Sequence, residues 1–371
     1  MTNEPVITEG DSNSNSDYSL QLNRWFLKPI GAWPSSPSTT RLEKIVSFVL
    51  NIICFTSVIV TAIPSLLLMI LEDESIYMKL KTLGPVSHWF VSSANYTALL
   101  IRGRDIRHCV EHIEADWRTV TREEDQHVMM KNAKFGRYVA ASCAVFMQAG
   151  VLCFCFVTAL TTTEIQIGNE TRVLHVLPCA VYKKLVNVDE SPANEIMLFL
   201  QIWAALIANS STVGIFSLAA VLAAHACGQL DVIMMWITKF VKEAREQKET
   251  SSFRKIGVIV ERHLRTLNFI SCIEDVMNRI YFLEMFRCTM DICVIGYYIL
   301  SCQKVGEVVY MTNWYYLPDK IILDLILIIA RSSMVVHITA GKLVHMSVYT
   351  FGDVCQFVFC IYSPVYVCPH T

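Results

Sequence analysis

The sequence has few charged residues for a chain of its length. Only 17% of its 371 residues are charged, whereas 53% are hydrophobic. A soluble domain usually carries about 25% charged residues, so this chain lacks the polar surface that would face water on every side. The composition excludes an ordinary soluble domain and predicts an integral membrane protein.

The common signatures of enzymes and nucleic-acid-binding proteins are also lacking. The chain has no nucleophile elbow, no paired carboxylates with a supporting base, no glycine-rich phosphate loop and no basic patch. His225 and Cys227 are one residue apart, but a zinc site needs a second pair of ligands that the sequence does not supply. We therefore expect no catalytic residue, no metal, no cofactor and no nucleic-acid partner.

Neither a signal peptide nor a disulfide framework is evident. Residues 1–22 are polar and contain neither the basic start nor the apolar core of a signal peptide, and they predict a disordered cytosolic tail. The chain has 14 cysteines, but many, such as Cys54, Cys143 and Cys155, lie in apolar runs. We expect most of them to be buried as small hydrophobic side chains.

Five apolar runs are long enough to cross the roughly 30 Å of hydrocarbon in a bilayer, which takes about 20 helical residues. They lie near residues 45–71, 83–101, 138–161, 196–224 and 281–302. The last run is weaker because Glu284, Arg287 and Asp291 share one helical face at its start. These side chains form either mutual ion pairs, which we favour, or an ion-binding site. The predicted fold class is an all-α integral membrane protein, with a transmembrane helical bundle over residues 23–302.

The distribution of lysine and arginine orients these spans. About eight lie in residues 102–137 and about nine in 225–279, compared with about two in 72–81 and about three in 162–195. Because loops rich in these residues remain in the cytosol, the N-terminus is predicted to be inside. The sequon that begins at Asn169 then lies outside, which makes Asn169 a predicted glycosylation site.

The loop between the fourth and fifth spans has a helical pattern of its own. Its apolar stripe comprises Leu230, Ile233, Met234, Ile237, Phe240 and Val241. Such a stripe on an otherwise polar helix in the cytosol predicts packing against other helices or subunits rather than against lipid.

Several stretches are specific enough to compare with a known family. They are LNRWFLKPIGAWP (22–34), HCVEHIEADW (108–117), LPCAVYKKLVNV with SPANEIMLF (177–199), NSSTVGIFSLAAVLAAHACGQLDVIM (209–234), EDVMNRIYFLEMFRCTMDICVIGYYIL (274–300), and KVGEVVYMTNWYYLP with ITAGKLVHMSVYTFGDV (304–354). Together they cover most of the chain, in family order. The chain resembles the insect odorant receptors, and within them the ant, bee and wasp subfamilies.

The resemblance implies a seven-helix subunit of an odorant-gated, non-selective cation channel with its N-terminus inside. It implies a heterotetramer with a shared co-receptor subunit in the plasma membrane of olfactory sensory neurons. A small volatile or hydrocarbon-like ligand would bind in a mainly apolar pocket in the outer half of the bundle. The last helix would line the pore. Cytosolic helical extensions would form a subunit anchor, to which we assign Leu230, Ile233, Met234, Ile237, Trp314 and Tyr315.

Candidate ligand contacts are outer-half residues on stripes expected to face the bundle interior. They are His88, Ser92 and Tyr96 in the second span, Gln148, Val151, Leu152 and Cys155 in the third, and Met197 and Gln201 in the fourth. Intramembrane Gln and His are costly against lipid, so we expect these side chains to face inward. Hydrogen bonding between helices explains each of them as well as ligand contact does, and both interpretations stay open.

The chain departs from the family pattern at two places. Only Ser301, Cys302 and Gln303 stand where the family has a complete sixth span, so about 40 to 50 residues are missing. After Val354 the chain reads CQFVFCIYSPVYVCPHT in place of the family's pore helix. Residues 303–371 are therefore predicted to form an anchor segment and an altered last helix.

Three functional hypotheses follow. The first is an odorant receptor subunit, and the second is a truncated, non-conducting isoform of one or an incomplete gene model. The third is a secondary transporter, which would favour an internal repeat that the sequence lacks. With five spans and an inside N-terminus, the residues after Gln303 would lie outside, unless the weak fifth run does not insert.

Overall fold

A computed structural model describes residues 9–36, 39–72, 76–167, 170–246, 252–333, 338–340 and 344–346. The chain divides into two compact units, residues 1–288 and 289–371. Helices dominate the described residues, and the strands among them form two short antiparallel hairpins. This composition of elements confirms the predicted all-α class.

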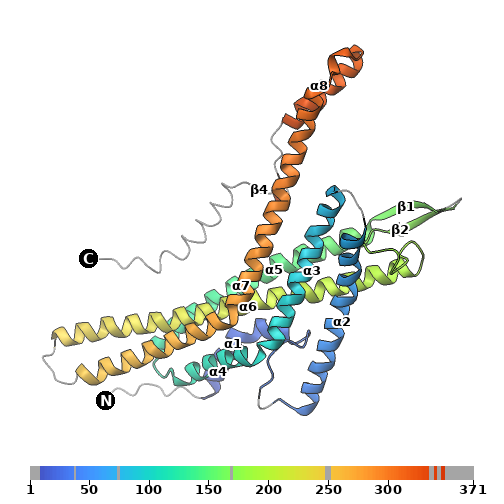
Figure 1. The fold of residues 1–371 in the computed structure, drawn as a ribbon. Helices are drawn as coiled ribbons and strands as arrows, with labels where there is room; N and C mark the ends of the chain where they lie inside the picture. Colours follow the sequence, from blue (N-terminus) through green and yellow to red (C-terminus); the bar gives the residue numbers. More distant parts are fainter. Residues whose placement is uncertain are drawn as a thin grey trace. The chain divides into compact units, whose positions relative to one another are not determined.

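The elements follow one another along the chain with short connections (Figure 1). The first unit contains α1 (Glu9–Leu27), α2 (Arg41–Leu71), α3 (Ile76–Ile101), α4 (Gly103–Thr119), α5 (Glu123–Leu160), β1 (Thr162–Ile167), β2 (Glu170–His175), α6 (Ala193–Glu246) and the larger part of α7 (Ser252–Met311). The second unit contains the end of α7, η1 (Trp314–Tyr316), α8 (Asp319–Ser333), β3 (Ile338–Ala340) and β4 (Val344–Met346).

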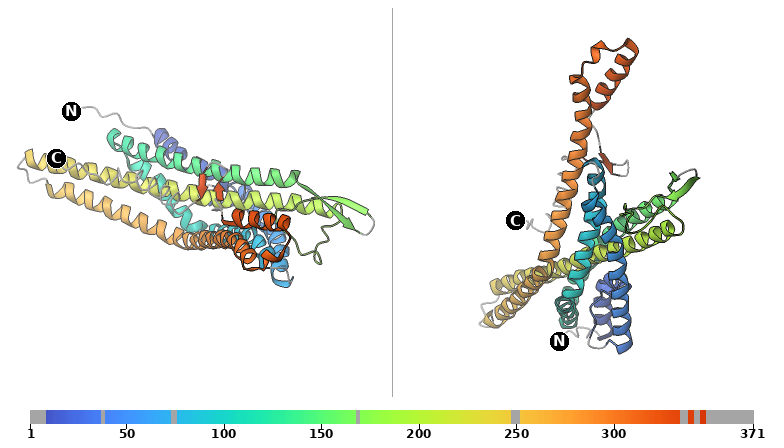
Figure 2. Two further views of the ribbon diagram at one scale, coloured as in Figure 1. Left: turned by 90° about the horizontal axis from the view of Figure 1, so that it is seen from above. Right: turned by 45° about the vertical axis from the view of Figure 1, so that its right-hand side comes forward.

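Helix α6 is the centre of the first unit. Helices α1, α2, α3 and α5 all contact it, and α5 runs beside it over much of its length (Figures 1 and 2). Small residues permit the close approach of α5, because a Cβ atom on Gly136 would lie only 2.5 Å from the Ala224 Cβ. Close contact through small residues is the usual way that helices pack in a membrane, where hydrophobic burial supplies little force between them.

Three helices among the described residues are long and apolar enough to cross a membrane. They are Arg41–Leu71, Glu123–Leu160 and Ala193–Arg245, which contain the first, third and fourth predicted spans. The second and fifth predicted spans lie within α3 and α7, so both are helical, and their insertion stays a prediction. Many large apolar side chains on α2 and α5 are exposed, as expected for surfaces that face lipid.

The prediction of a disordered tail is wrong for residues 9–22, which belong to α1. Leu20 and Leu27 are fully buried, and Leu27 packs directly against Gly214 of α6. Arg137 of α5 donates hydrogen bonds to the Tyr18 carbonyl at 2.7 Å and to Gln21 Oε1 at 2.9 Å. The composition of this segment misled the prediction because tertiary contacts, and not local propensity, stabilise the helix.

The ion-pair interpretation of the fifth apolar run is confirmed for two of its three charges. Arg287 Nε lies 2.9 Å from Glu284 Oε2, and Asn95 of α3 donates to the other carboxylate oxygen at 2.5 Å. Glu284 is buried in this arrangement. The charges at the start of this run therefore help to join α3 to α7.

In the second unit, which begins at residue 289, α7 continues past the junction at residues 301–303. The helix runs without interruption from Ser252 to Met311. Near its end, Gly306 lies directly against Ser332 of α8, so α8 folds back along α7. The altered last helix predicted after Val354 and the glycosylation site Asn169 lie outside the described residues.

The contact between α5 and α6 can be tested with two glycines of the same helix. We expect Gly136→Leu to lower the free energy of unfolding by about 1–3 kcal/mol or more, because its side chain would overlap Ala224. The measurement is thermal unfolding in detergent, followed by size-exclusion chromatography. Gly150→Leu is the matched control, since nothing lies within 4 Å of a Cβ atom at that position. Equal loss in both variants would contradict the proposed packing.

Candidate functional site

A cavity of about 740 Å³ opens beside the β1–β2 hairpin, and we call it the hairpin cavity. Its lining comes from the end of α2, the start of α3, β1, the chain from β2 to residue 189, and Asn194 of α6. Ten of its eighteen lining residues are apolar: Leu68, Met69, Leu174, Val176, Leu177, Pro178, Cys179, Ala180, Val181 and Val188. The charged residues of the lining are Glu72, Lys79, Lys183 and Asp189, together with His175. A mainly apolar cavity of this size suits a small molecule.

The wall of this cavity is held in place by Gln201 of α6. Its side-chain oxygen accepts a hydrogen bond from the Cys179 backbone N–H at 2.9 Å, and its side-chain nitrogen donates to the Cys179 carbonyl at 3.0 Å. Gln201 is fully buried. Its two hydrogen bonds satisfy the backbone N–H and C=O of Cys179, which lies in a loop outside any strand or helix. One amide side chain thus fixes the loop against the helical bundle.

Further bonds fix the same loop to two other helices. Trp89 Nε1 of α3 donates to Cys179 Sγ at 2.8 Å, and the Tyr182 N–H donates to the Pro64 carbonyl of α2 at 3.2 Å. Burial raises the pKa of the Cys179 thiol to about 11, although the hydrogen bond from Trp89 acts to lower it. The thiol therefore stays protonated at neutral pH and acts as a packing and hydrogen-bonding group, not as a nucleophile.

Polar contacts also join the two ends of this loop. Asn194 Oδ1 accepts from the His175 N–H at 3.0 Å, and its Nδ2 donates to the His175 carbonyl at 3.2 Å. Lys183 and Asp189 form an ion pair at 2.9 Å across the loop. The cavity therefore combines an apolar lining with a charged rim.

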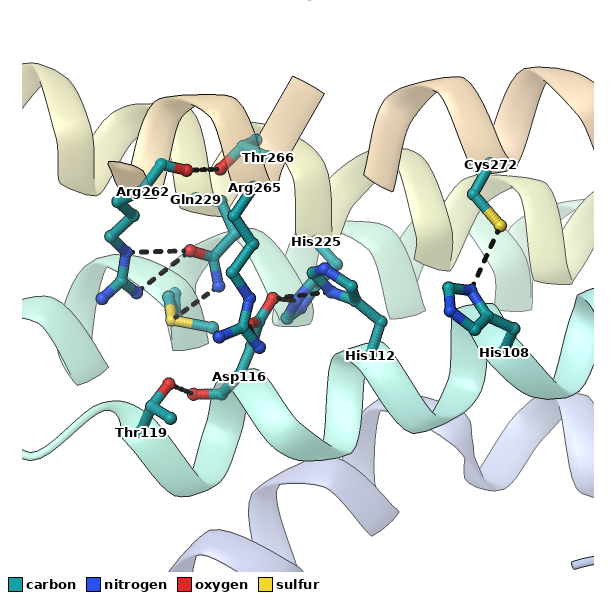
Figure 3. Close-up of polar contacts among 11 residues, drawn as sticks. His108, His112, Asp116, Thr119, His225, Gln229, Arg262, Arg265, Thr266 and Cys272 are labelled. Atoms are coloured by element: carbon teal, nitrogen blue, oxygen red, sulfur yellow. Dashed lines mark hydrogen bonds and ion pairs between the residues drawn. The ribbon is translucent and has the colours of Figure 1, made fainter. Parts of the chain in front are cut away.

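A second cluster of polar side chains lies among α4, α6 and α7, and we call it the Asp116 cluster (Figure 3). Asp116 Oδ2 lies 3.1 Å from His225 Nε2 and 3.0 Å from His112 Nδ1, while Asp116 Oδ1 lies 2.7 Å from Arg265 Nη2. Asp116 is only 4% exposed. Three helices far apart in the sequence are thus joined through one carboxylate.

The electrostatics of this cluster keep Asp116 ionised. Burial is the largest single influence and acts to raise the pKa of Asp116, but the hydrogen bonds and charge interactions with His112 and His225 together outweigh it and hold that pKa well below its usual range. The guanidinium of Arg265 supplies an opposite charge at 2.7 Å. A buried, paired and ionised carboxylate of this kind is costly to leave without its partners, so it favours one arrangement of the helices.

Neighbouring contacts extend the cluster to α5. Arg262 donates to Gln229 Oε1 through Nε at 3.2 Å and Nη2 at 3.0 Å, and its guanidinium lies 4.9 Å from the ring of Trp236. Trp236 Nε1 donates in turn to Asp125 Oδ1 of α5 at 2.9 Å. All four helices, α4 to α7, are therefore tied together on this side of the bundle.

Comparison with known proteins agrees with this architecture. The sequence signature of the family described as 7tm Odorant receptor matches residues 75–303, which is more than half of the chain. The chain belongs to the 7tm odorant receptor family. No curated protein sequence matches the receptor significantly.

Two solved structures share the receptor's fold. The olfactory receptor OR5 from Machilis hrabei aligns with a TM-score of 0.57 and 15% identity, over 95% of this chain and 99% of that chain. The structure of the same receptor in complex with eugenol aligns with a TM-score of 0.59 and 13% identity, over 96% of this chain and 99% of that chain. Together with the family match, they establish an odorant receptor fold in a multi-pass membrane protein.

None of the nine residues predicted as ligand contacts lines the hairpin cavity. Gln201 and Met197 lie behind its wall: Gln201 holds Cys179, and Met197 packs against Val181 and Val188. His88 is partly exposed, Ser92 is buried within the bundle, and nothing tests their contact with a ligand. The predicted contacts of all these residues with a ligand stay predictions.

The remaining candidates have other surroundings. Tyr96 is buried and donates a hydrogen bond to the Ile30 carbonyl at 2.8 Å, which joins α3 to the chain after α1; its contact with a ligand stays a prediction. Gln148 accepts from Asn209 Nδ2 at 2.7 Å, which is the inter-helix bond that the sequence left open. Val151 is partly exposed, Leu152 is exposed, and Cys155 is buried.

The anchor residues divide into buried and exposed ones. Ile233 is buried within the receptor, and Leu230 is partly buried. Met234 and Ile237 remain 46% and 45% exposed on α6. In the second unit, Tyr315 is exposed and Trp314 partly so. Contact of these residues with another subunit stays a prediction.

Sequence reasoning missed both the hairpin cavity and the Asp116 cluster. Asp116 and His112 lie four residues apart in HCVEHIEADW, a spacing that puts them on one helical face. That spacing was a usable signal, but nothing in the sequence pairs them with His225 or Arg265. The cavity had no signal, because most of its lining comes from a loop without regular periodicity.

We expect Gln201→Leu to destabilise the receptor by about 2–4 kcal/mol, because it leaves the buried N–H and C=O of Cys179 without partners. Thermal unfolding in detergent measures the loss. Asn209→Leu is the comparison, since it removes hydrogen bonds to the Gln148 side chain and the Met147 carbonyl but leaves no backbone group of the loop unpaired. An unfolding temperature for Gln201→Leu equal to that of the parent would show that Gln201 does not hold the cavity wall.

We expect Asp116→Ala to lower the free energy of unfolding by about 3–5 kcal/mol at neutral pH, because it removes the common partner of two histidines and an arginine. The folded-state pKa of Asp116 lies below the unfolded value near 3.9, so this stabilisation is present at neutral pH and is lost only as pH falls below about 4. Asp105→Ala, which removes a partly exposed ion pair with Arg102, should cost only about 0–1 kcal/mol. Equal costs for the two variants would contradict the central role of Asp116.

Proposed function

We propose that the chain is an odorant receptor subunit that gives ligand specificity to an odorant-gated cation channel. The single observation that carries the proposal is the match of the odorant receptor family signature over residues 75–303. The fold shared with OR5 from Machilis hrabei supports it. In this proposal the subunit lies in the plasma membrane of olfactory sensory neurons, with its N-terminus inside.

The ligand in this proposal is a small volatile or hydrocarbon-like molecule. OR5 from Machilis hrabei has been solved with eugenol, a small and largely apolar phenol. The hairpin cavity, about 740 Å³ and mainly apolar, has room for a molecule of that size and lies at the end of the bundle predicted to be extracellular. We propose it as the place where ligand first enters the receptor, with Met197 and Gln201 behind its wall. Ligand binding would then shift the population of the bundle toward an open pore.

The partner in this proposal is the odorant co-receptor, in a heterotetramer. An exposed apolar stripe on α6, made of Met234, Ile237 and Val241, supports a subunit contact there. Apolar side chains that remain together on the surface of a folded chain mark interaction sites more often than isolated ones do. Tyr315 in the second unit is a further proposed anchor residue.

A second candidate is a non-conducting form of the same receptor, and the continuity of α7 favours it. The helix has 60 residues and spans about 90 Å, so it contains no turn at which a sixth span could begin. In the described residues that follow, α8 has 15 residues, or about 22 Å, which is short of the roughly 30 Å hydrocarbon thickness. A subunit without a sixth span would lack one wall of its bundle.

Expression with the odorant co-receptor distinguishes the two candidates. Ligand-evoked current and co-purification are measured for the chain and for a chimera that carries two segments of a related receptor: its sixth span in place of residues 301–303 and its pore helix in place of residues 355–371. We expect both proteins to co-purify with the co-receptor and only the chimera to conduct, which would support the non-conducting form. Current from the unaltered chain would support a competent receptor subunit instead.

The same experiment can overturn both candidates. If neither protein co-purifies with the co-receptor, although both reach the cell surface, the proposed assembly is wrong. Met234→Glu together with Ile237→Glu tests the anchor: unchanged co-purification of this variant would contradict a subunit contact at the α6 stripe. Glu substitutions at the exposed Val258 and Leu264 of α7 serve as the matched control.

A further inference from the structure

Two cysteine sulfur atoms lie in contact between α4 and α7. Cys109 Sγ is 3.1 Å from Cys272 Sγ, although the residues are 163 positions apart in the sequence. Both thiols are free, Cys109 is fully buried, and Cys272 is partly exposed. A disulfide bond has an S–S length of about 2.05 Å, so an approach of about 1 Å would join them.

A polar cavity gives access to Cys272 but not to Cys109. Its volume is about 400 Å³, and its lining includes Cys272, His108 and Arg102. His108 Nδ1 lies 3.6 Å from Cys272 Sγ, and Figure 3 shows the imidazole directed at the sulfur. A small polar oxidant can therefore reach Cys272 beside a group able to take the thiol proton.

We propose that Cys272 is a site of reversible oxidation by hydrogen peroxide and that Cys109 resolves the product to a disulfide between α4 and α7. The exposed thiol reacts first because only it faces the cavity. Burial, followed by the hydrogen bond with Cys272, raises the pKa of Cys109 far above its usual value, so Cys109 is the less reactive of the two thiols toward peroxide.

The chemistry balances in two steps. In the first, the Cys272 sulfur attacks one peroxide oxygen while its proton passes to His108; an S–O bond forms, the O–O bond breaks, and the departing hydroxide takes up that proton to become water. In the second, the Cys109 sulfur attacks the sulfenic sulfur; the S–S bond forms, and the S–O bond breaks. The leaving hydroxide takes the Cys109 proton and leaves as water. Two thiols and one peroxide thus give one disulfide and two waters.

The disulfide would cross-link the helices that the Asp116 cluster already joins. Cys109 lies seven residues before Asp116 on α4, and Cys272 lies seven residues after Arg265 on α7. A covalent bond there would resist separation of α4 from α7. In a reducing compartment such a bond is expected to be transient and reversible by thiols, as for other redox-sensing cysteine pairs.

The test uses the full-length protein in membranes, treated with hydrogen peroxide and then analysed by peptide mass spectrometry. We expect a peptide that joins Cys109 to Cys272, lost on treatment with dithiothreitol. In Cys109→Ser, a sulfenic-acid trap should label Cys272, because the resolving thiol is gone. His108→Asn should slow the oxidation on the order of 10-fold, less than a well-placed general base would contribute, because the contact of 3.6 Å is long.

Three outcomes would overturn the proposal. They are no cross-linked peptide at any peroxide concentration, trapping of Cys272 in Cys109→Ser that does not exceed trapping of the exposed Cys227, and an unchanged rate in His108→Asn. Size-exclusion elution shows whether each variant has folded. If a variant does not fold, the sulfenic-acid trap is applied to the parent protein, and labelling of Cys272 is measured there. The outcome does not depend on the proposed odorant response, because no readout requires ligand or current.

Discussion

Close packing around α6 is the constraint on which the first unit depends. In the apolar window of α6, 67% of the residues are buried, compared with 28% for α2 and 17% for α5. Helix α6 is therefore surrounded by protein, whereas α2 and α5 each turn a wide face outward. Small residues at Gly136 and Ala224 let the backbones approach, which matters in lipid because dispersion contacts between helices grow with their proximity.

Polar contacts at the two ends of α6 complement this packing in different ways. At one end, Gln201 satisfies the backbone of an irregular loop and so shapes the hairpin cavity. At the other, His225 connects to Asp116, and through it to Arg265. One helix thus positions both the wall of a cavity suited to a small molecule and a group of helices joined through one carboxylate. A change in the position of α6 would therefore move both the cavity wall and the Asp116 cluster.

The match to the family ends at the junction of residues 301–303. Family membership rests on residues 75–303. The uninterrupted α7 lies across the junction, and the short α8 folds back along the helix instead of supplying a long span. The part of the chain that carries the family signature therefore ends within α7, before the helix turns back at α8.

The sequence by itself determined the fold class, the membrane character and the family, because these follow from composition, the length of apolar runs and local motifs. It also predicted the ion pair of Glu284 with Arg287, whose spacing is local. It failed at α1, where buried Leu20 and Leu27 override a polar composition. Only the tertiary structure decided that Gln201 meets Cys179, that Asp116 meets His225 and Arg265, and that Cys109 meets Cys272. Each of these contacts depends on the relative rotation and depth of helices distant in the chain, and no pattern within one helix specifies either quantity.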